Sequence, residues 1–130
     1  YMIFEAFKYN RLEYSDEPAF LVSSGDRFLP VTWKQFTDDI AIVSWIIRQY
    51  LPGGTIAILS ENSVEWMTLH AACILSNAVI VPVEVSLSAE EIAQRLKKVK
   101  ASALVHSSLY AEKAAEVSKL VPGLFVDGFC

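Results

Sequence analysis

The segment from residue 55 to residue 84 constrains the fold of this chain more than any other part of its sequence. It begins with a short apolar run, Thr55–Leu59, and ends with a second one, residues 78–83, and both are rich in β-branched residues. The stretch between them is apolar on nearly every side and long enough to form a buried helix. A strand, a helix and a second strand in this order predict a βαβ unit, whose two strands are parallel.

The sequence also indicates where the central helix of this unit begins. Asn62 has a side-chain oxygen that can accept a hydrogen bond from a free backbone N–H, and Glu65 stands three residues later at the capping-box position. Parallel α/β sheets bind ligands outside the carboxyl ends of their strands. We therefore expect functional residues within residues 60–62 and 82–86.

Weaker signals precede the βαβ unit. Residues 1–15 have a faint helical pattern, and two strand-like runs follow at residues 19–23 and 27–31. The two runs meet at Gly25-Asp26, a dipeptide that suits a tight turn. They therefore predict an antiparallel hairpin at the edge of the domain.

A helix is expected after the hairpin. Thr32 can cap it, and its apolar residues recur at spacings of three and four, which places them on one buried stripe. These residues are Trp33, Phe36, Ile40, Val43 and Ile47. The sequence Pro52-Gly53-Gly54 then ends the helix.

Two more helices follow the βαβ unit. Ser88 is placed to cap the first, and Glu91 stands at its capping-box position. The charges of this helix agree with its dipole, because glutamates are near its start and lysines near its end. Ser107 or Ser108 is placed to cap the second helix.

Two short apolar runs, at residues 103–106 and 124–126, predict the remaining strands. Strands and helices thus alternate without a linker, a repeat or a low-complexity segment. This order predicts a doubly wound α/β fold, with a mostly parallel sheet of about four strands flanked by helices and an N-terminal antiparallel hairpin. Residues 1–130 are expected to form one α/β subdomain.

Composition and charge remove several classes of function. The chain has 130 residues, 53% of them hydrophobic, and its net charge of −4 offers no basic surface for nucleic-acid phosphates. No apolar stretch reaches the roughly 18 residues that suggest a membrane-spanning helix, and no secretory signal is recognisable. We therefore expect a cytoplasmic protein. Cys73 and Cys130 have no zinc-binding spacing, and Cys73 is expected to be a core residue.

Candidate catalytic residues are few. The five glycines form neither of the common phosphate-binding patterns, GxGxxG and GxxxxGK[ST]. His106 ends a predicted strand, and Glu61 and Glu84 each follow one, so the two carboxylates can converge at the functional edge. We interpret them as a structural histidine and two solvated loop carboxylates, because no partner stands at a catalytic spacing. We interpret His70 as a hydrogen-bonded histidine at the boundary of the core.

Several of these segments, in this order and spacing, resemble the N-terminal region of acyl-adenylate-forming enzymes. This superfamily contains the AMP-forming acyl-CoA synthetases, the luciferases and the adenylation domains of peptide synthetases. The first family motif is matched by VTWKQF at residues 31–36, and the second by ILSNAVIVPVE at residues 74–84. The similarity also includes EPAFLV at residues 17–22 and AILSENSVEW at residues 57–66, so it covers nearly the whole chain.

The chain departs from the family pattern at two places. Ser76-Asn77 stands where the family has alanine and glycine, and asparagine can replace glycine in a left-handed helix cap. Glu84-Val85 stands where asparagine or aspartate followed by proline is common. In some acyl-CoA synthetases this loop lies near the nucleotide of CoA, and the resemblance therefore implies that Glu84, Val85 and Ser86 form a substrate-binding loop.

The resemblance implies a ligase that joins a carboxylic acid, a fatty acid in our expectation, to AMP from Mg-ATP. The acyl group then passes to a thiol such as that of CoA. The family's phosphate loop, nucleotide contacts and catalytic lysine occur later in its sequences. We therefore expect this chain to be an inactive N-terminal fragment whose partners are the rest of the ligase chain, with no catalytic or metal-binding residue of its own.

Other interpretations remain open at this stage. The acceptor can be a carrier-protein thiol, as in the adenylation domain of a peptide synthetase. A self-sufficient flavodoxin-like or receiver-like module, or a dinucleotide-binding domain, fits the alternation of elements but lacks the expected acidic, lysine or glycine signals. If the chain is a fragment, it exposes an apolar face and self-associates when isolated.

Overall fold

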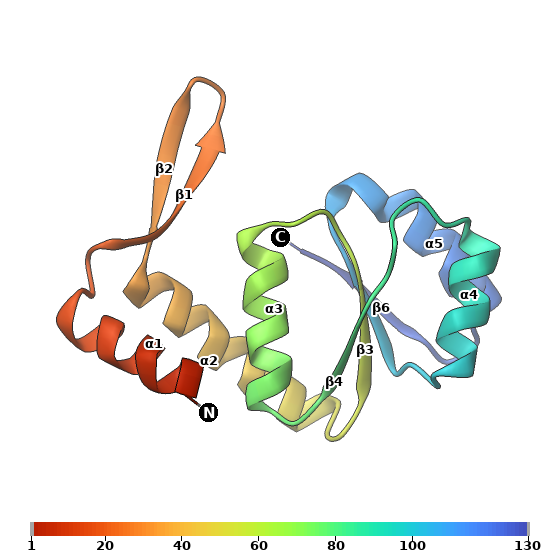
Figure 1. Ribbon diagram of the computed structural model, residues 1–130. Helices are drawn as coiled ribbons and strands as arrows, with labels where there is room; N and C mark the ends of the chain where they lie inside the picture. Colours follow the sequence, from red (N-terminus) through yellow and green to blue (C-terminus); the bar gives the residue numbers. More distant parts are fainter. Residues whose placement is uncertain (1, 130) are drawn as a thin grey trace.

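A four-stranded parallel sheet forms the centre of the molecule. In the computed structural model, which describes residues 2–129, its strands are β3 (Thr55–Leu59), β4 (Val79–Pro82), β5 (Ala103–His106) and β6 (Phe125–Gly128). Their order across the sheet is β4-β3-β5-β6, and every neighbouring pair is parallel. The predicted βαβ unit is confirmed, and Figure 1 shows its strands crossing the middle of the molecule.

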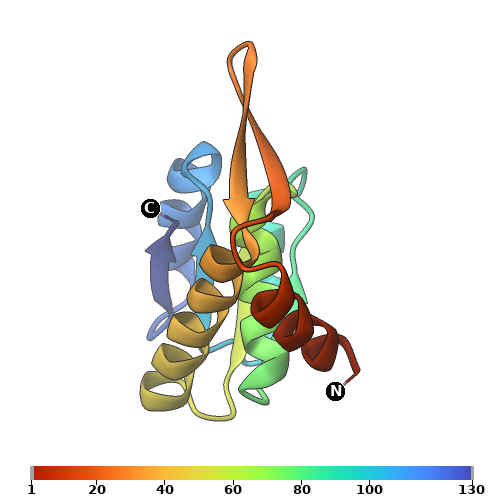
Figure 2. The ribbon, with the colours of Figure 1, turned by 90° about the vertical axis from the view of Figure 1, so that its left-hand side faces the viewer.

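Helices cover both faces of this sheet, as a doubly wound fold requires. Helices α2 (Trp33–Tyr50) and α3 (Val64–Leu75) lie on one face, and α4 (Ala89–Lys98) and α5 (Ala111–Leu120) on the other (Figures 1 and 2). Strand β3 supplies both cores because its side chains alternate. Ile56 and Ile58 pack with α2 and α3, whereas Ala57 and Leu59 pack with α4 and α5.

The N-terminal elements stand apart from the sheet. Helix α1 (Met2–Glu13) leads into an antiparallel hairpin of β1 (Pro18–Ser24) and β2 (Arg27–Thr32). Gly25 has a φ of 65°, which glycine adopts without the steric cost of a side chain, and the predicted turn is confirmed. Figure 2 shows the hairpin projecting beyond the helices as an arm, while α1 lies beside α2 and α3.

Local capping signals set most helix starts. Thr32 and Ser88 each accept a hydrogen bond from the backbone N–H three residues later, and both form complete capping boxes. The cap predicted at Asn62 is wrong. Ser63 caps α3 by accepting from the N–H of Trp66 at 3.0 Å, because the chain leaving β3 uses residues 60–62 to turn and becomes helical only at Val64.

The departure at Ser76-Asn77 is compatible with the fold. Asn77 has a φ of 59°, in the left-handed region where the family has glycine. The N–H of Ala78 donates to the carbonyl of Cys73 at 2.9 Å, and the N–H of Asn77 donates to that of Ile74 at 3.3 Å. This pair of bonds is a Schellman motif, so asparagine ends α3 and turns the chain into β4.

Candidate functional site

The loops at the carboxyl ends of β3 and β5 are joined by a hydrogen bond. The hydroxyl of Ser107 donates to a carboxylate oxygen of Glu61 at 2.7 Å. Ser107 is buried, whereas Glu61 remains exposed to solvent. The serine begins a short 3₁₀ helix, η1 (Ser108–Tyr110), but its hydroxyl makes no capping bond there. Ser107 thus stands at the start of η1, but the cap predicted at Ser107 or Ser108 is wrong for the α-helix: α5 begins only at Ala111, after Tyr110.

His106 is held in place at the end of β5. Its Nδ1 lies 2.9 Å from the carbonyl oxygen of Ser107, which can only accept, so this bond places a proton on Nδ1. The ring lies over Gly128 of the neighbouring strand, where a Cβ would come within 3.0 Å of the ring atom Cε1. These contacts agree with the interpretation of His106 as a structural histidine.

The loop at residues 83–88, between β4 and α4, contains the predicted substrate-binding residues. It turns at Glu84, whose carbonyl accepts a hydrogen bond from the N–H of Leu87 at 3.2 Å. Val85 and Leu87 pack against the core beneath α4 and α5, whereas Glu84 and Ser86 are exposed. The predicted residues thus lie at the carboxyl edge of the sheet, with two side chains facing solvent.

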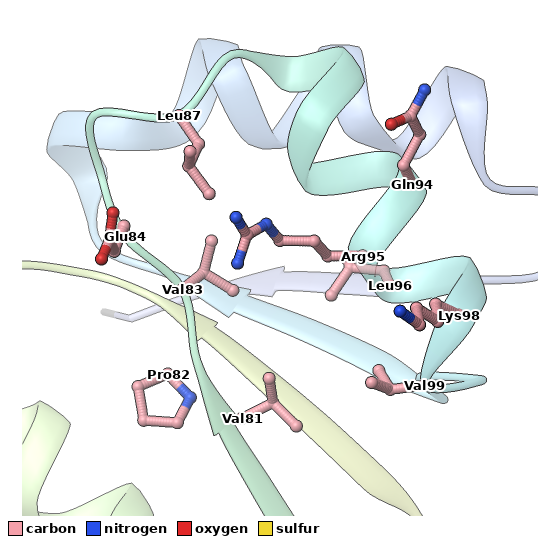
Figure 3. Close-up of a pocket in the computed structure, with 10 residues that line it drawn as sticks. All are labelled: Val81, Pro82, Val83, Glu84, Leu87, Gln94, Arg95, Leu96, Lys98 and Val99. Atoms are coloured by element: carbon pink, nitrogen blue, oxygen red, sulfur yellow. The ribbon is translucent and has the colours of Figure 1, made fainter.

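An open pocket of about 750 Å³ lies between this loop, β4 and α4 (Figure 3). Val81, Val83 and Leu87 give it an apolar wall. Arg95 extends from α4 across the pocket, and its guanidinium group points toward the loop that carries Glu84. Lys98 adds a second positive charge. A pocket with an apolar wall and two cationic side chains suits a ligand that has both an apolar part and a negative charge.

The two candidate carboxylates have different surroundings. Glu61 is bound to Ser107 in the loop after β5, and Glu84 lies at the rim of the pocket beside α4. Both are exposed, in agreement with the interpretation as solvated loop carboxylates.

His70 and Cys73 lie on α3 in apolar surroundings. The ring of His70 is tilted against that of Trp66, with 5.0 Å between the centroids. His70 is half-buried, but the expected hydrogen bond is not formed at Nδ1, which is enclosed without a partner among residues 2–129. The apolar side chains of α1, α2 and α3 supply no acceptor or donor there. Cys73 is a core residue as predicted, and burial raises the pKa of its thiol to about 11. Cys130 is outside the described residues.

Sequence reasoning missed three residues at this edge of the sheet: Ser107 as the partner of Glu61, Arg95 in the pocket, and Lys113. The Nζ atom of Lys113, on α5, donates to the carbonyls of Val85 and Leu87 at 2.7 and 2.8 Å. Arg95 stands in the last turn of α4, where a positive charge suits the helix dipole, so nothing local marks it out. Lys113 stands in the first turn of α5, where a positive charge does not suit the dipole, but the sequence alone does not show which distant carbonyls it meets.

Within residues 2–129, no group of three or more His, Cys, Asp or Glu side chains is arranged to hold a metal ion. In the same part of the chain, no helix has the length and apolar character needed to cross a bilayer.

A known protein family and several solved structures resemble this chain. A family model described as "AMP-binding enzyme" matches residues 7–127. The chain belongs to this family. No curated protein gives a significant match to this chain.

Solved structures with the same fold include several ligases. A protein assigned as a long-chain-fatty-acid CoA ligase from Rhodopseudomonas palustris is 25% identical, with a TM-score of 0.80 over 97% of this chain and 32% of the other. A benzoate CoA ligase from Burkholderia xenovorans is 12% identical, with a TM-score of 0.78 over 97% of this chain and 25% of the other. The A-PCP didomain of carboxylic acid reductase from Segniliparus rugosus, in complex with AMP, is 16% identical, with a TM-score of 0.77 over 94% of this chain and 20% of the other.

These comparisons confirm the family and the fold predicted from the sequence. The benzoate CoA ligase and the carboxylic acid reductase didomain are too dissimilar in sequence to show more than the fold. This chain spans no more than about a third of the length of any of the three solved structures, since it covers 32%, 25% and 20% of them.

Proposed function

We propose that residues 1–130 form one subdomain in the N-terminal, AMP-binding domain of an acid–thiol ligase. The complete ligase activates a carboxylic acid with ATP, forms an acyl-adenylate and passes the acyl group to CoA. The observation that carries this proposal is the family match over residues 7–127. The fatty acid as substrate is supported by the similarity to the long-chain-fatty-acid CoA ligase, at 25% identity over 97% of this chain.

In this proposal the subdomain is a scaffold wall, and the chemistry is carried out by other parts of the ligase. Mg-ATP needs carboxylates for the metal and a cradle of backbone N–H groups for the phosphates. The sequence contains neither of the common glycine-rich phosphate loops, so this chain does not fit the second requirement. We therefore assign no catalytic residue to this chain and place its ligase in the cytoplasm, where ATP and CoA are available.

The loop at residues 83–88 is the proposed contribution of this chain to substrate binding. Glu84, Val85 and Ser86 would lie on the side where the nucleotide of CoA approaches. The position of the loop at the carboxyl edge of a parallel sheet supports this assignment. The positive charges of Arg95 and Lys98 in the adjoining pocket support it as well, because CoA carries phosphates.

The remainder of the ligase is the proposed partner of the outer face of α2. Ile42, Trp45, Ile46 and Tyr50 form an exposed apolar stripe on this helix, and its opposite face already packs in the core. A helix that is apolar on two opposite sides typically lies inside a protein, packed between two other layers of structure. The relatives are several times longer than this chain, so the rest of their fold is long enough to supply the layer that covers the stripe.

The test is an assay of the complete ligase against a panel of fatty, aromatic and amino acids. Acid-dependent exchange of pyrophosphate into ATP measures adenylation, and thioester formation with CoA measures transfer. The proposal expects exchange with a fatty acid and a CoA thioester as the product. Exchange with no CoA thioester, but with acylation of a carrier-protein thiol, would replace CoA by the alternative acceptor. Saturable binding of FMN with no exchange would favour a flavodoxin-like module and overturn the proposal.

A further inference from the structure

We propose that Lys113 is a positioning residue. It holds the 83–88 loop in the conformation that binds the nucleotide of CoA. This inference rests on the proposed function, in which that loop lies on the CoA side. Lys113 acts through the loop and touches no reacting atom.

The hydrogen bonds of Lys113 provide the first argument. Its ammonium group donates to the carbonyls of Val85 and Leu87 at 2.7 and 2.8 Å, although Lys113 stands on α5, 26 residues after Leu87 in the sequence. Charged donors make stronger hydrogen bonds than neutral ones. The ion pairs among residues 2–129 are those of Asp38 with Arg11 and Lys34, so the charge of Lys113 is directed at these backbone carbonyls and at no carboxylate.

The composition of the loop provides the second argument. Residues 83–88 contain no glycine, proline, asparagine or aspartate, and their two serines, Ser86 and Ser88, favour a turn only weakly. The local sequence therefore has little control over the turn from Glu84 to Leu87, and its own backbone bond is the longer one, at 3.2 Å. Lys113 supplies a constraint that the loop residues themselves do not.

The rigidity of α5 provides the third argument. Ala114, next to Lys113, and Val117, one turn later, are completely buried in the core beneath α4 and α5. The main chain that carries Lys113 is thus fixed against the sheet. Because the ammonium holds the inward side of the loop, where Val85 and Leu87 pack, Glu84 and Ser86 are left facing solvent in a defined arrangement.

The test uses three variants of the complete ligase. Lys113→Met keeps the apolar stem and removes the donors, and Lys113→Arg keeps a charged donor as a conservative rescue. Lys119→Met is the matched control, since Lys119 is an exposed lysine on the same helix. Hydrogen exchange of the loop amides and of β3 is measured in each variant, together with the KM for CoA, kcat and pyrophosphate exchange.

We expect Lys113→Met to speed exchange of the loop amides about tenfold and to leave β3 protected. The KM for CoA should rise by a similar factor, and pyrophosphate exchange should stay unchanged. Lys113→Arg should partly restore both the protection of the loop amides and the original KM for CoA. Unchanged exchange of the loop would overturn the inference but not the proposed function. Faster exchange of the loop amides with an unchanged KM for CoA would show that the loop takes no part in binding CoA, and would overturn the inference. If pyrophosphate exchange fell by the same factor as the KM for CoA rose, the variant would have a general structural defect. That result would also overturn the inference.

Discussion

The hydroxyl of Ser107 donates a 2.7 Å hydrogen bond to the carboxylate of Glu61, which links the carboxyl ends of β5 and β3. Because Ser107 is only 5% exposed, its hydroxyl has little access to water when this bond is lost. Glu61→Ala, which leaves that buried hydroxyl unpaired, should lower the free energy of unfolding by about 1–2 kcal/mol.

A double-mutant cycle of Glu61→Ala and Ser107→Ala, followed by urea unfolding, measures this coupling. Ser108→Ala is the control, because Ser108 is an exposed neighbour that should change stability by less than about 0.5 kcal/mol. Strictly additive effects of Glu61→Ala and Ser107→Ala would show that the bond contributes nothing.

The start of α3 gives a prediction that compares two neighbouring residues. Ser63 accepts the capping hydrogen bond from Trp66, so Ser63→Ala should cost about 1 kcal/mol of stability. Asn62 precedes the cap, and Asn62→Ala should change stability by less than about 0.5 kcal/mol. Denaturant unfolding of both variants checks the assignment, and the opposite order of costs would move the cap back to Asn62.

The ion pairs of Asp38 predict a change of stability with pH. A hydrogen bond from Arg11, and a second from Lys34, lower the pKa of Asp38 below its ordinary value of 3.8. A carboxyl group whose pKa is lower in the folded state stabilises the fold above its unfolded pKa, and this contribution is lost as the pH falls through the folded value. The stabilisation by Asp38 should therefore be complete at neutral pH and disappear below about pH 4.

Asp38→Asn should accordingly be less stable than the original protein at pH 7 and indistinguishable from it at pH 2. Urea unfolding across this range measures the difference. Because the pair is largely exposed, 1 M salt should reduce the difference at pH 7, and an effect that grows with salt would contradict the electrostatic explanation.

The buried thiol of Cys73 should be unreactive in the folded protein. Burial raises its pKa to about 11, so about one thiol in a thousand is ionised at pH 8, and only the thiolate attacks a disulfide reagent. Labelling with Ellman's reagent in a Cys130→Ser background should be slow in the folded protein and stoichiometric in denaturant. Rapid labelling of the folded protein would show that α3 opens readily or that Cys73 is accessible.

The exposed stripe on α2 should make the isolated 130-residue chain self-associate. Trp45 and Ile42 are each 57% exposed. Replacing both with glutamate should lower the particle mass measured by light scattering and the binding of an apolar dye. Leu12→Glu is the control, because Leu12 is 79% exposed but lies on α1, outside the stripe. In the complete ligase the same double substitution should instead destabilise the fold.

A strictly monomeric original chain that binds no dye would show that the stripe needs no cover. Equal effects of the α1 and α2 substitutions would show that exposure in general, and not this stripe, causes the association.

Much of the fold follows from local sequence patterns. The bounds of β3 and β5, the turn at Gly25 and the caps at Thr32 and Ser88 were all predicted, because each depends on residues within a few positions of one another. Asn62 was mistaken for a cap because two adjacent polar residues both satisfy the local rule, and the path of the chain out of β3 selects the second.

The sequence by itself determined the alternation of strands and helices, and with it a parallel sheet covered on both faces. The spacing of hydrophobic residues and the capping residues are local properties, and together they favour this order of strands and helices. Only the tertiary structure decided which polar groups meet at the carboxyl edge of the sheet. Ser107 reaches Glu61 across 46 residues, and Lys113 reaches the carbonyl of Val85 across 28. Such pairs depend on the order and register of the strands, which place distant segments side by side and leave no mark on the residues next to them in the sequence.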